Sequence, residues 1–148
     1  CSGAFMFKKL WDSGAFITLG TDGSASNNNV SMLDEMKLAA LSAKLQSGDP
    51  TAAAAEQVFQ AATRNGAEAL GIDAGVIAEG KLADCILVDL NNTLLVPNYN
   101  LISNMVYSAD SSVIDTVLCN GRILMQNKKI DGEEDIISQA RKIAAKLA

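Results

Sequence analysis

AFITLGTDGSASNNN, at residues 15–29, joins an apolar run of β-forming residues to a loop of Gly, Ser and Asn. The run AFITLG predicts a short strand buried on both faces, the kind found in a parallel sheet or barrel. Asp22 follows it after Thr21, and its carboxylate is costly to leave unpaired at the edge of a buried strand. The candidate partners are groups of the loop itself, a calcium ion, or a metal ion whose other ligands lie outside this chain.

The calcium interpretation fails on spacing. Alternate polar residues of the loop have the spacing of EF-hand ligands: Asp22, Ser24, Ser26 and Asn28. That motif needs a Gly where Asn27 stands and a bidentate Glu where Leu33 stands. Spacing alone leaves open whether Asp22 caps the loop through Asx-type bonds or binds a metal.

Composition excludes several classes of protein. The chain has 148 residues, enough for one domain with a core, and a formal net charge of -5, which offers no basic surface to nucleic acid. No apolar run approaches the roughly 20 residues needed to cross a bilayer, so we expect no membrane partner and a cytoplasmic location. The count of zero histidines excludes a self-contained zinc hydrolase and a Ser-His-Asp enzyme.

The pattern of apolar residues changes near residue 73. Before it, helices are expected at about residues 31–45 and 50–70, the second opening with Pro50, which a first helical turn tolerates. A short helix is also expected to end at the Asp12-Ser13-Gly14 stop signal. Together with the strand at residues 15–20, this order is typical of an α/β fold.

After residue 73 the chain predicts short strands and one closing helix. The runs that favour strands are GVIAEG, ADCILVDL, VIDTVLCNG and RILMQNKKI. The pair Asn120-Gly121 predicts a tight hairpin, and Asp84 is interpreted as a turn acceptor rather than a catalytic group. Apolar residues recur at helical spacing in residues 133–148, which predicts an amphipathic helix.

Three stretches carry a family pattern in order and in spacing: LGTDGSASNNN at 19–29, ATRNGAEALGIDAGVIAEGKLADCILVDL at 62–90 and VIDTVLCNGRILMQNKKI at 113–130. They resemble the amidohydrolase superfamily, in particular its adenosine, methylthioadenosine and S-adenosylhomocysteine deaminases and its triazine chlorohydrolases. The first is similar to the end of the family's last barrel strand. The second is similar to its A-T-x-N-x-A-x-x-L-G and G-x-I-x-x-G-x-x-A-D motifs, and the third to its late V-x-V-x-V-N-G hairpin.

The resemblance implies a fold. It predicts the C-terminal part of a (β/α)₈ barrel plus a portion of a small β-sandwich with a terminal helix. Residues 1–72 would be the last part of the metal-dependent hydrolase barrel. Residues 73–148 would be the composite β-sandwich domain with its closing helix. The chain begins at Cys1 without a methionine, which agrees with the expectation of further barrel strands upstream.

The resemblance also implies a chemistry. Such enzymes hydrolyse C-N bonds by deamination, or C-Cl bonds, on purine, pyrimidine or triazine rings. By its place after the strand, Asp22 would be a ligand of a divalent metal, zinc or else iron, and the catalytic proton acceptor. The family's histidine ligands are expected on strands that this chain lacks, so we expect the isolated chain to hold no metal and to be inactive.

Residues after Asp22 would meet the substrate. Gly23, Ser24, Ser26 and Asn27 are expected to line the mouth of the site and bind a small heterocyclic molecule. Capping of the following helix explains these four residues equally well. An incomplete barrel also exposes the strand at residues 15–20, which predicts a homo-oligomer or self-association.

Two other classes of function remain open. The chain could come from a non-catalytic structural relative that kept the scaffold and lost the metal. It could also be a small binding module that uses the loop at residues 22–29 as an anion nest, although neither a GxGxxG nor a Walker pattern occurs.

Overall fold

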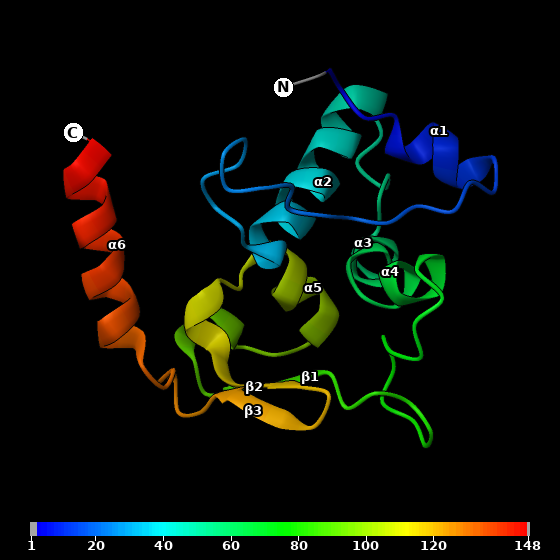
Figure 1. Cartoon of the computed structure of the whole chain (residues 1–148). Helices are drawn as coiled ribbons and strands as arrows, with labels where there is room; N and C mark the ends of the chain where they lie inside the picture. The colour runs from blue at the N-terminus through cyan, green and yellow to red at the C-terminus, as the bar shows by residue number, and fades with distance from the viewer. Residues whose placement is uncertain (1–2, 148) are drawn as a thin grey trace.

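The computed structural model describes residues 3–147, in which five helices gather on one side of a small sheet and a sixth stands apart (Figure 1). The helices are α1 (Phe7–Asp12), α2 (Met32–Ser47), α3 (Ala55–Ala62), α4 (Arg64–Ala69), α5 (Leu101–Tyr107) and α6 (Glu133–Leu147). The strands are β1 (Cys85–Val88), β2 (Ile114–Cys119) and β3 (Arg122–Met125), and two 3₁₀ turns are η1 (Thr93–Leu95) and η2 (Ser111–Val113). This mixed α/β content agrees with the fold class predicted from the sequence.

Helix α2 follows the loop that contains Asp22. Ser31 is its N-cap and accepts a hydrogen bond from the amide of Asp34 at 3.4 Å. Asp34 and Glu35 lie in the first turn, where the helix dipole favours negative charge. The helix ends at Gly48, whose φ of 67° lies in the left-handed region that glycine adopts without strain. The helix expected at residues 31–45 is therefore confirmed.

The strand expected at residues 15–20 is wrong for this chain. The segment has no strand pairing, and although Ile17 is buried, Phe16 is 55% exposed. Its backbone instead bonds to the neighbouring helices: the Leu19 amide donates to the Ala61 carbonyl at 2.8 Å, and the Asn65 side chain donates to the Ile17 carbonyl at 2.8 Å. A strand needs a second strand to form a ladder, and residues 3–147 offer none beside it.

The helix expected at residues 50–70 is shorter and broken. The Asp49 carboxylate accepts the Thr51 amide at 2.8 Å, which forms a turn in place of the first helical residues, so α3 begins at Ala55. The break between α3 and α4 falls at Thr63. In an unbroken helix the Ala61 carbonyl would accept a hydrogen bond from the amide four residues on. The break leaves this carbonyl free to accept the Leu19 amide instead.

The core is made mainly by the helices. One buried cluster joins α1, α2, α3 and α5: Phe7, Ile17, Met36, Ala40, Ala43, Ala53, Ala55, Val58, Ala61 and Val106. Phe7 also stacks on Trp11, with ring centroids 5.6 Å apart. A second cluster lies between α5 and the sheet: Leu95, Met105, Ala109 and Val113. Because Leu33 and Phe59 pack against both clusters, the two continue into each other.

The sheet has three antiparallel strands in the order β1-β2-β3. Asn120 and Gly121 connect β2 to β3 with φ values of 47° and 74°, the left-handed pair that a tight hairpin turn requires, so the predicted hairpin is confirmed. Asp84 accepts the Asn120 amide at 2.6 Å, which confirms its structural role. The run GVIAEG does not form a strand.

This sheet is the only one within residues 3–147, so a second sheet of the predicted sandwich is not formed by them. The predicted division at residues 72 and 73 stays a prediction. Helix α5, which comes after it, contributes Val106 to the cluster built by α1, α2 and α3.

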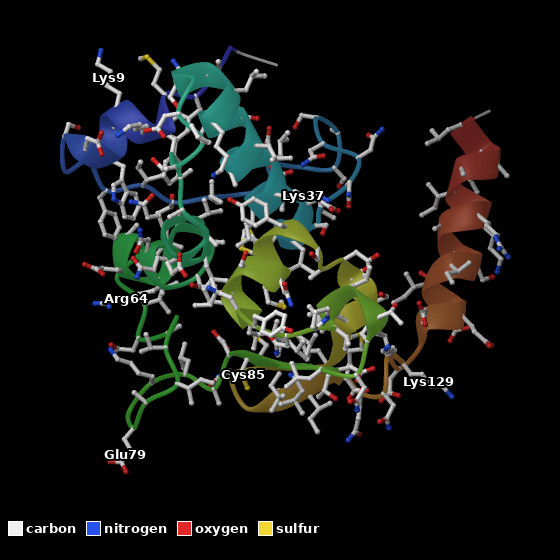
Figure 2. All side chains as sticks on the ribbon, turned by 180° about the vertical axis from the view of Figure 1, so that it is seen from behind. Lys9, Lys37, Arg64, Glu79, Cys85 and Lys129 are labelled. Atoms are coloured by element: carbon white, nitrogen blue, oxygen red, sulfur yellow. The ribbon has the colours of Figure 1, made fainter. Side chains whose placement is uncertain are left out.

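Helix α6 confirms the amphipathic helix expected at the end of the chain. It has no buried residue, and both views place it to one side of the other helices (Figures 1 and 2). Within residues 3–147, no helix combines the length and the apolarity that crossing a membrane requires.

Candidate metal-binding loop

Asp22 lies in an exposed loop between the 15–20 segment and α2. Its φ of 58° is in the left-handed region, which residues other than glycine seldom adopt. Both carboxylate oxygens accept hydrogen bonds: Oδ1 from the Gly23 amide and Oδ2 from the Ser26 hydroxyl, each at 2.7 Å. The Ser26 hydroxyl and then the Gly23 amide hold the pKa of Asp22 below its usual value, because both stabilise the charged form.

The loop closes on the carbonyl of Gly23. The amides of Ser26 and Asn27 donate to this oxygen at 3.0 and 2.9 Å, and the Ser26 hydroxyl lies 3.1 Å from it. The turn therefore keeps Ser26 within reach of Asp22. The bonds that the Asp22 carboxylate accepts from Gly23 and Ser26 are the local capping that the spacing had left open as an alternative to metal binding.

Two asparagines tie the loop to the first turn of α2. Asn27, which is half-buried, donates through Nδ2 to the Thr21 carbonyl at 2.9 Å and to Glu35 Oε1 at 2.6 Å. Asn29 donates through Nδ2 to Asp34 Oδ2 at 2.6 Å. The helix thus fixes the loop at two points.

The structure brings most of the predicted site residues together. Gly23 and Ser26 bond directly to Asp22, and Asn27 reaches the Thr21 carbonyl just before it. Ser24 is exposed at the turn of the loop. The predicted contacts of these residues with substrate stay a prediction.

Sequence reasoning missed Glu35 as part of this loop. Its place in a helical first turn suggested only an interaction with the helix dipole. The contact with Asn27 spans eight residues through a loop with no periodic signal. The sequence feature that could have indicated this contact is an acidic residue in the first helical turn after a loop rich in amide side chains.

The two carboxylate oxygens of Asp22 have the chemistry of a metal ligand. Each oxygen of Asp22 has one hydrogen-bond donor, so lone pairs remain on both for a cation. Within residues 3–147, no group of three or more His, Cys, Asp or Glu side chains is placed to hold a metal ion. Because catalytic zinc sites ordinarily have three protein ligands, Asp22 could supply only one of the ligands that such a site needs.

A hollow lined by described residues lies away from this loop. It has a volume of about 600 Å³ between α2, α3, α5 and β1, and no residue of the 21–29 segment lines it. Most of its lining is apolar, including Met36, Phe59, Val76, Ile102 and Met105. Cys85, at the start of β1, also lines it and lies beneath the helices in Figure 2. The hollow therefore carries no part of the Asp22 site.

Comparison with known proteins decides the family. A model of the Amidohydrolase family matches residues 1–124. The chain belongs to this family. A 5-methylthioadenosine/S-adenosylhomocysteine deaminase of Thermococcus onnurineus is 50% identical over 129 residues, which are 87% of this chain and 30% of that protein. A 5'-deoxyadenosine deaminase of Methanoregula boonei is 44% identical over 144 residues, which are 97% of this chain and 33% of that protein.

Solved structures agree with this amidohydrolase assignment. A zinc-bound adenosine deaminase from Xanthomonas campestris superimposes with a TM-score of 0.87 at 32% identity, over 93% of this chain and 32% of that one. A zinc complex of an atrazine chlorohydrolase from Arthrobacter aurescens gives 0.80 at 29% identity, over 91% of this chain and 31% of that one. The family resemblance predicted from the sequence is confirmed. The amidohydrolase chain spans about a third of the length of these relatives.

Proposed function

We propose that this chain is the C-terminal part of a metal-dependent amidohydrolase that removes the amino group from an adenosine-type ring. Asp22 carries the proposal, because it is a carboxylate with free lone pairs at the loop where the family pattern expects a metal ligand. The relatives that are 44 to 50% identical are deaminases of adenosine derivatives, which supports this substrate class. In this proposal residues 1–72 complete a (β/α)₈ barrel, and residues 73–148 contribute to a β-sandwich.

Asp22 would have two tasks in the reaction. A divalent metal, when bound, supplies the charge that lowers the pKa of a water molecule enough for attack on an electron-poor ring carbon. The free lone pairs of Asp22 would bind that metal and accept the proton of the attacking water. The same carboxylate would then deliver the proton to the departing amine. The hydrogen bonds from Gly23 and Ser26 favour the ionised form that accepts the proton.

The loop after Asp22 would approach the ring of the substrate. Ser24 is exposed, and its hydroxyl could bond to a ring nitrogen or to an exocyclic group. The hydroxyl of Ser26 is already donated to Asp22, so Ser26 would approach a substrate chiefly as an acceptor. We include Gly23 and Asn27 in the same substrate-facing loop.

A C-Cl hydrolase is the second candidate. The atrazine chlorohydrolase from Arthrobacter aurescens has the same fold over 91% of this chain, but at 29% identity it is less similar than the deaminases. The chemistry proposed for Asp22 would serve either leaving group. A non-catalytic relative would lack turnover on both kinds of substrate.

The test uses a polypeptide of full family length that carries this chain, loaded with zinc and assayed on 5'-deoxyadenosine, methylthioadenosine, S-adenosylhomocysteine, adenosine and atrazine. We expect turnover of the adenosine derivatives and little with atrazine. Asp22→Asn keeps the size of the side chain but removes its charge and its basicity. It should lower turnover by at least the ~10² to 10⁴ attributed to general acid-base catalysis.

Asp84→Asn is the matched control, since Asp84 bonds to the hairpin turn at Asn120 and an amide oxygen can still accept that bond. Its turnover per folded molecule should be unchanged. Normal turnover of Asp22→Asn would contradict the proposed metal site, and no turnover on any substrate would favour the non-catalytic alternative.

A further inference from the structure

We propose that Asn27 and Glu35 act as a positioning pair, which holds the peptide bond before Asp22 and so presents the Asp22 carboxylate to the metal. The proposal rests on the function proposed for Asp22 and gives Asn27 a role other than contact with substrate. Neither residue of the pair is proposed to touch the metal. Four observations carry the inference.

The first observation is the conformation of Asp22. A φ of 58° is unfavourable for any residue with a Cβ, so the surrounding contacts must hold it. Such strained residues persist where the structure around them determines their conformation, and they gather at functional sites. A metal ligand that is held in advance of binding is one reason to retain the strain.

The second observation is the place at which Asn27 acts. Its Nδ2 donates to the carbonyl of Thr21, which belongs to the peptide unit that enters Asp22. Fixing that carbonyl restricts rotation of the peptide plane on which the φ of Asp22 depends. Asn27 therefore acts on the backbone of Asp22 without touching its carboxylate.

The third observation is what holds Asn27 itself. The same Nδ2 lies 2.6 Å from Glu35 Oε1, a short bond to an ionised acceptor. Both hydrogens of the amide are thus used, which fixes the side chain in one orientation. None of the ion pairs within residues 3–147 involves Glu35, so no lysine or arginine competes for its carboxylate.

The fourth observation is a matched contact in the same loop. Asn29 makes a bond of the same kind and length to Asp34, also in the first turn of α2. The side chain of Asn29 makes no hydrogen bond to Thr21 or Asp22. Its removal should weaken the attachment of the loop to the helix and leave the backbone of Asp22 in place. Asn29 is therefore the control that separates positioning from general stability of the loop.

The principal experiment measures zinc affinity in the full-length protein that carries this chain, by competition with a chelator, together with the melting temperature. Asn27→Ala and Glu35→Ala should each weaken zinc binding by about 10 to 100-fold, the range for losing a partner that orients a ligand. Glu35→Gln keeps an oxygen acceptor and should retain most of the affinity. Asn29→Ala should bind zinc as the unmodified protein does, even where its melting temperature falls as far as that of Asn27→Ala.

A second experiment needs no metal and uses the 148-residue chain itself. The amide of Gly23 donates to Asp22 Oδ1, so its hydrogen exchange reports whether this bond persists. Exchange of this amide, measured by NMR, should be faster in Asn27→Ala than in Asn29→Ala. Glu35→Ala, whose change lies on α2 outside the loop, should match Asn27→Ala.

Equal zinc affinity of Asn27→Ala and Asn29→Ala, or equal Gly23 exchange in the two, would overturn the positioning role. The proposed function fails by a different result, which is unchanged zinc affinity in Asp22→Asn. Loss of zinc in Asp22→Asn with full retention in Asn27→Ala and Glu35→Ala would remove the positioning pair and leave the metal ligand.

Discussion

Asp22 accepts one hydrogen bond from its nearest neighbour and one from Ser26, four residues on. Such local bonds are predictable in kind, because a lone Asp before Gly and Ser favours Asx-type turns. The role of Asp84 as a turn acceptor was predictable for the same reason and is confirmed. The contact between Asn27 and Glu35 was not predictable, since it joins residues eight positions apart across a loop that has no periodic pattern.

The pair of Asp73 and Lys81 gives a test at the level of single residues. Lys81 Nζ donates to Asp73 Oδ1 at 2.8 Å. This hydrogen bond, and then the positive charge of Lys81, holds the pKa of Asp73 below its usual value. A depressed pKa in the folded state gives a stabilisation that is complete above the unfolded pKa of about 4 and is lost as the pH falls through the lower folded pKa.

We therefore expect Lys81→Gln to raise the pKa of Asp73, measured by NMR titration of its carboxyl carbon. The stability difference between the two proteins should shrink below pH of about 4, as Asp73 becomes protonated. The difference should be small at every pH, because the Asp73 side chain is 79% exposed and solvent screens the pair. The same Asp73 pKa in both proteins would show that the pair does not form in solution.

At the level of elements, segments whose partners lie close in the chain were predicted well. The hairpin at Asn120 and Gly121, the end of α1 and the start of α2 follow from local turn and capping chemistry. The segment at residues 15–20 was predicted as a strand and is not one, because its ladder needs strands that these residues do not provide. The predicted start of α3 was wrong, because the Asp49 carboxylate accepts a hydrogen bond from the Thr51 amide.

Gly75 gives a test of how α4 is packed. Its φ is 81°, and a Cβ at this position would lie 2.9 Å from the Arg64 Cα and 3.0 Å from the Ala67 Cβ. Gly75→Ala should therefore combine backbone strain with a clash against a helix, and should lower the free energy of unfolding by about 2 kcal/mol.

Gly80→Ala is the matched control for this test. The φ of Gly80 is 77°, but no atom lies within 4 Å of its added Cβ, so it should show the backbone strain alone. Urea denaturation of both variants measures the difference. Equal losses of stability would show that α4 does not approach residue 75 as closely as the structure has it.

At the level of the whole molecule, motifs in order and spacing predicted the family, and the family match over residues 1–124 confirms it. The arrangement of the sandwich and the full set of metal ligands were beyond prediction from these residues. The family resemblance implies histidines as further ligands, and the chain has none. When the ligands of a metal site come from strands far apart in the sequence, a single stretch contains only some of them.

Exposed apolar surface at this scale predicts self-association of the isolated chain. Large apolar side chains on the sheet and on α6 are 42 to 60% exposed: Ile86, Leu87, Ile123, Leu124, Ile136, Ile137 and Ile143. Large apolar side chains exposed in such number tend to be covered by another molecule. Sedimentation velocity over a range of concentrations should show association that increases with concentration. A single monomeric species throughout would contradict this expectation.

The most direct test of the central claim is anomalous diffraction at the zinc edge from crystals of a full-length protein that carries this chain. We predict a zinc ion at about 2.0 to 2.2 Å from a carboxylate oxygen of Asp22, with histidines from the preceding part of the protein as further ligands. Zinc bound entirely by other residues, with the Asp22 carboxylate still bonded only to Gly23 and Ser26, would contradict the claim.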